Sequence, residues 1–402
     1  MGGSRRSPPA EAGPAGPRPS DRLRSLVASA LADAVPGGGV VALALSGGRD
    51  SIALLDAALA CAPTAGARIV AIHVHHGLSA NADRWRDFCA ATCAALGVEI
   101  AIREVAIERR PRASLEALAR TARYAALRAA AHEFGAAAVL LAHHADDQSE
   151  TLLLQLLRGS GPRGLAAMPP AQTDDRFLWL RPLLALPRAD IDAYVAGRGL
   201  AYVDDESNAE PAHRRNALRL RVVPALREIA PGYPGTLLRA AALQAEAALL
   251  ADDLAQIDAQ AALDAGTLDR AALAALPARR ARNLLRWFLR ECGLPAPSAR
   301  RLAELLRQLC APDASPELRI AHADSEVSLH RGRIVVHDPA PPPYACELPG
   351  DAIDLPHGRL VFSAGKGAGI AARHFAHSRI SFPAGSPAER LQLAGGRPRR
   401  AV

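Results

Sequence analysis

Lysine is almost absent from this chain of 402 residues, because Lys366 is the only lysine in it. That position lies far toward the C-terminus, so a Schiff-base or general-base lysine in the N-terminal part is excluded. Arginine therefore carries nearly all of the positive charge, and the formal net charge is +7. A basic chain fits a polyanionic partner such as nucleic acid, but a GC-rich genome that favours arginine would give the same balance.

Paired cysteines and long apolar runs are also missing. No C-x-x-C pair occurs, which argues against a zinc ribbon or an iron–sulfur site, and scattered free thiols are typical of a reducing cytosol. The cysteines are Cys61, Cys89, Cys93, Cys292, Cys310 and Cys346. No uncharged apolar run reaches 18 residues, so a membrane span is not expected. We therefore expect a cytoplasmic protein with no membrane partner.

Residues 1–20 are rich in proline, glycine and arginine, lack the apolar core of a secretory signal, and are predicted to be disordered. Residues 21–229 then alternate between short apolar runs and stretches with a helical period, which predicts an α/β domain with a doubly wound parallel sheet. The predicted strands are Val40–Leu45, Arg68–His75, Glu99–Ile107 and Ala137–Ala142. The predicted helices are Arg22–Val35, Asp50–Cys61, Ala82–Leu96 and Ser114–Phe134.

The composition and the sequence pattern change at about residue 230. Residues 230–338 are predicted to form a mostly helical domain that ends in a hairpin, with Arg331-Gly332 at its turn. Pro339–Pro343 reads as a linker, and residues 344–402 contain short strand-like runs between glycine-rich turns. The apolar helices of residues 235–309 fit either a homodimer surface or an ordinary domain core.

The segment SGGRDS follows the first predicted strand and opens the next helix. Two glycines let successive backbone N–H groups turn inward toward an anion, and the helix N-terminus adds a positive dipole end. An acid in such a loop would repel bare phosphate, so Asp50 indicates a bound Mg²⁺. An ordinary capped strand-to-helix turn is the alternative. The candidate nucleotide-binding residues are Ser46, Gly47, Gly48, Arg49, Asp50 and Ser51.

Two histidine-rich segments end other predicted strands. In HVHHGLS, His73 ends the second strand beside the expected phosphate loop, which suggests contact with the adenosine, although strand-end histidines near solvent are common. In HHADDQSET, Asp147 and Glu150 fit an N-terminal capping box, which explains the acids but not the histidines before them. His143 and Asp147 are expected to face one crevice, where each could serve as a base or charge stabiliser for an amine.

Three further segments carry charge. RGSGPRGL contains Arg158, which could hold phosphate or RNA backbone but could equally end a helix. Asp205–Asn208 reads DESN and is followed by RRNALR, in which Arg215 and Arg219 are four residues apart. This spacing puts both guanidinium groups on one helix face, where they could grip phosphates, although such charge runs are often solvated faces.

Taken in order, these motifs and the run E-x-x-A-R-x-x-R-Y at residues 116–124 resemble tRNA(Ile)-lysidine synthetases, which belong to the PP-loop ATP pyrophosphatases. The resemblance is strong over residues 40–230 and weaker to about 337. It implies that ATP adenylates the C2 carbonyl oxygen of the wobble cytidine in tRNA(Ile) with a CAU anticodon. Free L-lysine then displaces AMP and gives lysidine.

The resemblance assigns roles to residues of this chain. It places the SGGRDS loop on ATP and Mg²⁺, His143 and Asp147 in the active site, and Arg215, Asn216 and Arg219 near ATP. One departure concerns the C-terminus, where residues 390–400 resemble only the beginning of the family's last tRNA-recognition domain. We therefore expect residues 344–402 to be a truncated form of that domain.

Two other functions compete with this interpretation. A PP-loop tRNA thiolase would need paired catalytic cysteines, whereas Cys89 and Cys93 share one predicted helix away from the strand ends. A vestigial, RNA-binding protein would bind RNA regardless of ATP and lysine.

Overall fold

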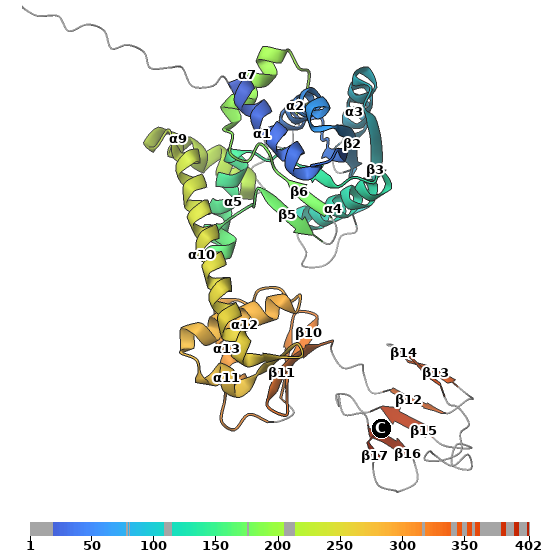
Figure 1. Cartoon of the computed structure of the whole chain (residues 1–402), viewed down its shortest axis with the longest axis vertical. Helices are drawn as coiled ribbons and strands as arrows, with labels where there is room; N and C mark the ends of the chain where they lie inside the picture. Colours follow the sequence, from blue (N-terminus) through green and yellow to red (C-terminus); the bar gives the residue numbers. More distant parts are fainter. Residues whose placement is uncertain are drawn as a thin grey trace, which may run out of the picture. The chain divides into compact units, whose positions relative to one another are not determined.

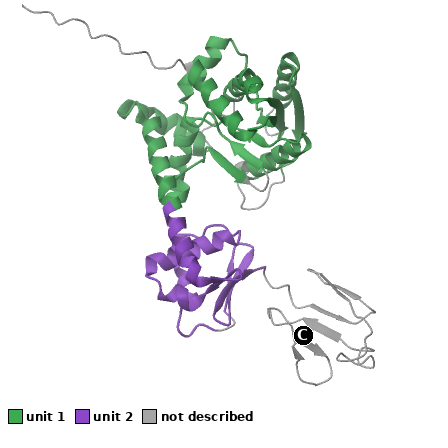
Figure 2. Cartoon of the chain, in the orientation of Figure 1, with its two compact units in different colours: residues 1–249 green, residues 250–402 purple. Residues whose placement is uncertain are grey.

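The computed structural model describes residues 19–77, 79, 81–107, 115–174, 177–204, 214–315 and 318–338, together with short strands between residues 344 and 401 (Figure 1). Most of the predicted disordered segment 1–20 lies outside these residues, but Pro19 and Ser20 begin helix α1 (Pro19–Ala34). The chain divides into two compact units between Leu249 and Leu250, coloured separately in Figure 2. Each unit is described by itself.

A six-stranded sheet forms the centre of the first unit, in the order β3-β2-β1-β4-β6-β5. Its strands are β1 (Gly39–Ala44), β2 (Ala67–His75), β3 (Glu99–Glu104), β4 (Ala138–Leu140), β5 (Ala171–Asp174) and β6 (Phe177–Leu180). All neighbours are parallel except the edge pair β5–β6. The parallel sheet is confirmed. The sequence did not predict β5 and β6, because four-residue runs are too short to show a period.

Helices cover both faces of this sheet. Helix α1, α2 (Arg49–Ala65), α3 (Ala82–Leu96) and α7 (Arg188–Arg198) contribute to the core on one face, and α4 (Leu115–Glu133) contributes to the core on the other. Helices α5 (Ala145–Leu157) and α6 (Pro162–Leu165) follow β4 in the chain. Strand β1 shows why two layers are needed: Val41 and Leu43 belong to the core that holds Leu54 of α2, whereas Ala42 belongs to the core that holds Leu127 of α4. Side chains alternate between the faces, and both faces are buried.

The strand ends differ slightly from the predicted ones. The third strand ends at Glu104 rather than Ile107, and β4 keeps only Ala138–Leu140 of the predicted run. The loops that follow β1, β2 and β4 leave from the carboxyl edge of the sheet. In open parallel sheets this edge is where ligands bind.

The first unit ends in a helical segment. It contains α8 (Arg214–Ala217), a π-helical turn η2 (Leu218–Val222), α9 (Val223–Ile229) and the long helix α10 (Tyr233–Ala262), which continues past Leu250 into the second unit. The DESN motif at Asp205–Asn208 lies outside the described residues. No helix in the described ranges is long and apolar enough to cross a membrane.

The second unit packs the end of α10 and the helices α11, α12 and α13 on a five-stranded sheet with the order β7-β8-β11-β10-β9. Its elements are α11 (Arg270–Ala275), α12 (Ala278–Glu291), α13 (Ala299–Leu309), β7 (Leu263–Asp264), β8 (Thr267–Asp269), β9 (Arg319–His322), β10 (Ser325–His330) and β11 (Arg333–His337). The predicted hairpin is confirmed, since β10 and β11 are antiparallel and Arg331 and Gly332 turn with positive φ of 49° and 80°. The short strands β7 and β8 were not predicted and interrupt the region predicted as mostly helical.

Strands also occur in the C-terminal segment. They are β12 (Tyr344–Glu347), β13 (Ala352–Leu355), β14 (Gly358–Val361), β15 (Arg379–Phe382), β16 (Arg390–Leu393) and β17 (Arg400–Ala401). Four of them form one antiparallel sheet, in the spatial order β12-β15-β16-β17, and β13 pairs with β14. The linker predicted at 339–343 lies outside the described residues.

Candidate active site

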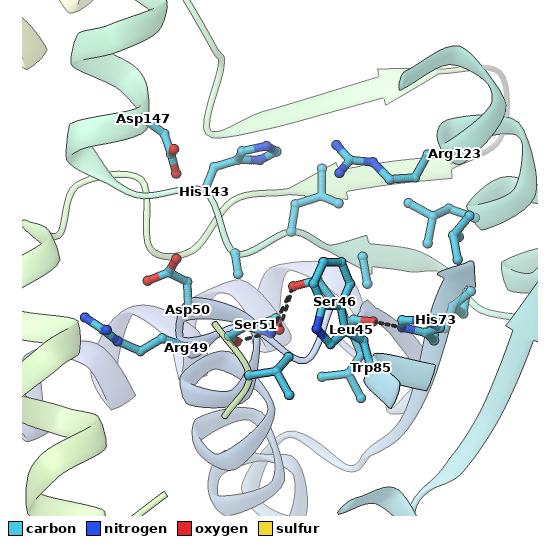
Figure 3. Close-up of a pocket in the computed structure, with 18 of the residues that line it drawn as sticks. Leu45, Ser46, Arg49, Asp50, Ser51, His73, Trp85, Arg123, His143 and Asp147 are labelled. Atoms are coloured by element: carbon cyan, nitrogen blue, oxygen red, sulfur yellow. Dashed lines mark hydrogen bonds between the residues drawn. The ribbon is translucent and has the colours of Figure 1, made fainter. Parts of the chain in front are cut away.

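The SGGRDS loop connects β1 to α2 and closes one wall of a cavity in the first unit (Figure 3). Gly47 has a positive φ of 84°, and a Cβ there would lie 3.0 Å from both Cys89 Sγ and Val203 Cγ2. Only glycine fits this position. Ser51 Oγ donates to the Gly48 carbonyl at 2.8 Å and lies 3.1 Å from Ser46 Oγ, so both hydroxyls converge at the helix N-terminus. Such a turn exposes N–H groups and hydroxyls to an anion.

Asp50 is the acid of this loop, and its carboxylate is incompletely satisfied. Oδ1 is buried without a hydrogen-bond partner in the described part of the chain, and Oδ2 lies 3.7 Å from His144 Nε2. Burial raises the pKa of Asp50. A buried carboxylate oxygen without a partner fits a divalent cation, because Mg²⁺ in nucleotide sites binds one or two carboxylates and the phosphates.

His143 and Asp147 lie across the cavity from this loop, where β4 leads into α5 (Figure 3). Asp147 was expected at the N-cap of a capping box, and this prediction is wrong. His144 is the N-cap, and its backbone N–H donates to the carboxylate of Asp147 at 3.0 Å. The local helix therefore begins three residues earlier than expected, which aims both side chains into the cavity.

The protonation states of these two groups differ. Burial lowers the pKa of His143 to about 3, and its Nδ1 is buried without a partner among the described residues. Burial raises the pKa of Asp147, but His144 and Arg215 outweigh that effect, so its pKa is lowered overall. At neutral pH the cavity therefore presents a neutral imidazole beside an ionised carboxylate.

Arg215 and Arg219 face α5 rather than open solvent. Arg215 donates to Glu150 at 2.7 Å and to Asp147 at 2.8 Å, and Arg219 donates to Glu150 at 2.8 and 3.0 Å. Their shared helix face is as predicted, but its partners here are two carboxylates. Glu150 is only 2% exposed, so it is a buried anion held by two guanidinium groups.

His73 closes the side of the cavity at the end of β2. Its Nδ1 lies 2.9 Å from the Leu45 carbonyl, an acceptor, so Nδ1 carries the proton in the neutral ring. Burial lowers the pKa of His73, which keeps that ring neutral. Nε2 is then left with its lone pair as an acceptor.

Arg49 also borders the cavity, and it is strongly engaged. Its guanidinium group pairs with Asp192 of α7 and lies 4.7 Å from the ring centre of Tyr202. The Val203 N–H donates to the Gly47 carbonyl at 3.0 Å, so the segment after α7 is bound to the phosphate loop. These contacts give Arg49 a role in positioning the loop.

Several residues that line the cavity were not among the predicted site residues, including His75, His76, His144, Arg188 and Asp204. Trp85 of α3 and Arg123 of α4 both line the cavity (Figure 3). Arg123 is held against the ring of Tyr124, with 5.7 Å between its guanidinium carbon and the ring centre. Burial lowers its pKa. Arginines within the predicted helix were a usable signal, but helical period alone did not show which of them faces the strand ends.

Other predicted residues lie elsewhere. Arg158 is exposed at the C-cap of α5, about 20 Å along the helix from its N-terminus. Asn216 is buried in α8 and does not line the cavity.

The predicted position of the two cysteines of α3, away from the strand ends, is wrong for Cys89. Both are buried, and Cys89 lies directly behind Gly47 instead of away from the strand ends. Burial raises the pKa of Cys89 to about 12 and that of Cys93 to about 11, so both are inert thiols at neutral pH.

A second cavity in the same unit adjoins the first and shares His144, Arg188 and Arg219 with it. Asp146, Glu150 and Asp192 supply carboxylates to its wall, and Arg227 and Tyr233 complete the polar lining. Across the described ranges, no group of three or more histidine, cysteine or acidic residues is arranged to hold a metal by itself. A cation at Asp50 would therefore share its ligands with the nucleotide.

Family models match both units. Residues 21–226 match the PP-loop domain, and residues 268–335 match the TilS substrate binding domain. Among solved structures, the U34-tRNA thiolase NcsA from Methanococcus maripaludis is similar with a TM-score of 0.48 and 16% identity, over 56% of this chain and 78% of that one. A likeness at that level carries no argument about function.

Curated relatives are more informative. A tRNA(Ile)-lysidine synthase of Ralstonia nicotianae is 42% identical over 95% of this chain and 86% of its own length. Another, from Azoarcus sp., is 40% identical over 89% and 79%. The Burkholderia pseudomallei protein is 48% identical over 75% of this chain and 62% of its own length. With two matching family models and such identities, the chain belongs to the tRNA(Ile)-lysidine synthase family.

Proposed function

We propose that this protein uses ATP to join L-lysine to C2 of the wobble cytidine in tRNA(Ile) with a CAU anticodon, forming lysidine, AMP and pyrophosphate. The observation that carries the proposal is the SGGRDS loop at the end of β1, facing His143 and Asp147 across one cavity, in a chain of this family. Formally, the C2 carbonyl oxygen attacks the α-phosphorus and pyrophosphate leaves. The lysine ε-nitrogen then attacks C2, AMP leaves, and the nitrogen gives up a proton.

We assign the first step to the phosphate loop. Ser46, Gly48 and Ser51 supply hydroxyl and N–H donors to the phosphates at the N-terminus of α2. Asp50 would hold Mg²⁺, which would neutralise phosphate charge as pyrophosphate departs. Arg123 brings a buried positive charge with no carboxylate contact in the described residues, so it can meet negative charge that develops in the cavity. His73 and Trp85 line the same cavity, where we expect them to contact the adenosine of ATP.

We assign the second step, the attack of lysine on C2, to the residues that follow the end of strand β4 and to the second cavity. Carboxylates and guanidinium groups line that cavity together, which suits an amino acid with two charged termini and a cationic side chain. Asp147 is ionised and can stabilise the amine as it arrives. His143 is neutral, since its pKa is lowered to about 3, and its lone pair can accept a hydrogen bond from the arriving lysine nitrogen, whose proton then leaves to solvent.

A second copy of the chain is the proposed protein partner. On α10, Leu243, Leu250 and Ile257 are exposed and follow each other at seven-residue intervals. Such a repeat is self-complementary between two helices. Sedimentation velocity should show a dimer that Leu250→Glu dissociates; a monomer at micromolar concentration in the unchanged protein would contradict the dimer.

The test of function is one assay with purified protein, CAU-anticodon tRNA(Ile) transcript, ATP-Mg²⁺ and labelled L-lysine. We expect ATP-dependent label in the tRNA, lost when the wobble base is changed. ATP–pyrophosphate exchange with tRNA but without lysine transfer would support only the adenylation step. The absence of both lysine transfer and ATP–pyrophosphate exchange would contradict the proposal.

The competing functions predict other results. A thiolase needs a reactive thiolate, which the buried Cys89 and Cys93 do not provide. A vestigial RNA-binding protein would bind tRNA equally well with or without ATP and lysine, and would transfer no label.

A further inference from the structure

Helix α12 lies in the second unit (Figure 1). Its sequence ARRARNLLRWFLRE is rich in arginine. One face is apolar and packs into the core of this unit through Ala281, Leu284, Leu285, Phe288 and Leu289. The arginines occupy the rest of the circumference. They fall into two groups that differ in their partners.

The first group is paired with acids of α10. Arg280 forms an ion pair with Asp258, which is 6% exposed, and Arg290 lies 3.0 Å from Asp252. Between them, Asn283 donates to the Ala251 carbonyl. These contacts fix α12 against the C-terminal half of α10, so these two arginines are accounted for by the fold.

The second group is Arg279, Arg282 and Arg286, and we call it the arginine stripe. The spacing of three and four residues puts all three on one helix face over about 10 Å of axis. Each is exposed, and none has a carboxylate partner within the described ranges. The guanidinium group of Arg286 is partly covered although the residue is exposed, and this partial burial, followed by the charge of Arg282, lowers its pKa.

Like charges four residues apart destabilise a helix, and no intramolecular anion offsets them here. Since the fold does not use the arginine stripe, an external anion is the simplest partner. Exposed, unpaired arginines along one helix suit a phosphodiester backbone, whose charges are themselves regularly spaced. The stripe also lies inside the matched TilS substrate binding domain.

We infer that the arginine stripe is a docking surface for the phosphate backbone of the substrate tRNA. This rests on the proposed function, because it takes tRNA as the polyanion. The stripe reads no base, so it adds affinity without choosing the wobble nucleotide.

The test compares two double variants of the full-length protein with equal loss of charge. Arg282→Gln/Arg286→Gln removes two stripe residues. Arg307→Gln/Arg319→Gln removes two arginines of the same unit that lie outside α12 and are paired with Glu304 and Glu326. The affinity for tRNA(Ile) transcript is measured from 0.05 to 0.3 M KCl.

Each lost phosphate contact should reduce the slope of log K against log salt by about 0.7–0.9, so the stripe variant should lose about 1.4–1.8. Affinity should then fall about 25- to 60-fold at 0.1 M salt, since the lines converge near 1 M. The control variant should keep the slope of the unchanged protein. Equal slopes for all three proteins would overturn the inference, as would equal losses in the two variants, which would indicate only a general effect of net charge.

Lysine transfer at saturating tRNA separates this inference from the proposed function. The stripe variant should keep the maximal rate and raise only the tRNA concentration needed for it. If the unchanged protein transfers no lysine, and both it and the variants bind tRNA with the expected salt slopes, the proposed function is contradicted and the docking surface is supported. If the unchanged protein transfers lysine and the stripe variant binds tRNA as tightly as it does, the docking surface is contradicted and the proposed function is supported.

Discussion

Asp50 is a residue whose burial is costly for folding and which we propose as the ligand of Mg²⁺ in the nucleotide site. Its Oδ1 is buried without a partner in the described structure, and burial raises its pKa. A carboxyl group whose folded pKa is raised destabilises the fold above that pKa, because burial disfavours its ionised form. A cation would relieve this cost.

Asp50→Asn should therefore separate activity from stability. We expect ATP–pyrophosphate exchange to fall on the order of a thousandfold or more, since the metal position is lost. The melting temperature without Mg²⁺ should stay the same or rise, and tRNA affinity should be nearly unchanged. Exchange assays and thermal melts measure both effects. Normal turnover by the variant would refute the assignment of Asp50.

His143 makes a prediction about pH. Its folded pKa is about 3, while an unfolded histidine titrates near 6.5. Between these values the unfolded chain binds more protons, so His143 makes the protein less stable as the pH falls from about 6.5 toward 3. His143→Asn should flatten this loss. Thermal melts of both proteins at pH 7.5, 6 and 5 check it, with the other histidines as a shared background. Parallel pH profiles would contradict a buried, neutral His143.

At the scale of elements, the turn between β1 and α2 depends on one glycine more than on its neighbour. Gly47 has positive φ, and its Cβ would meet Cys89 and Val203, whereas Gly48 has φ of −70° and a nearest neighbour at 3.4 Å. Gly47→Ala should cost about 1–3 kcal/mol of unfolding free energy and raise the KM for ATP. Gly48→Ala is the matched control and should cost well under half as much. Urea unfolding measures both; equal losses would mean that the loop relaxes around either side chain.

Elements with a clear period were predictable from sequence, and contacts between elements were not. The helix Ala82–Leu96 and the turn at Arg331-Gly332 follow from local patterns, as does the phosphate loop between an apolar strand and a helix. The position of Cys89 behind Gly47 depends on how α3 packs on the sheet, which no local pattern encodes. The partners of Arg215 likewise come from α5, far away in the chain.

At the scale of the whole molecule, the chain contains separate hydrophobic cores. The sheet of the first unit is buried on both faces, with Leu54 fully buried on one of them. The second unit has its own core, in which Leu305 is fully buried. The cavities lined by the phosphate loop, His143 and Glu150 draw all their residues from the first unit. Nucleotide binding and the stability of the second core should therefore be separable.

Calorimetry should then show two unfolding transitions. Leu54→Ala and Leu305→Ala each remove a fully buried leucine and should cost about 2–5 kcal/mol, but each in a different transition. ATP-Mg²⁺ binds only the folded first unit, so it should raise the transition that Leu54→Ala lowers and leave the other in place. A single transition shifted by both substitutions would mean that the continuous helix α10 couples the two cores into one cooperative unit.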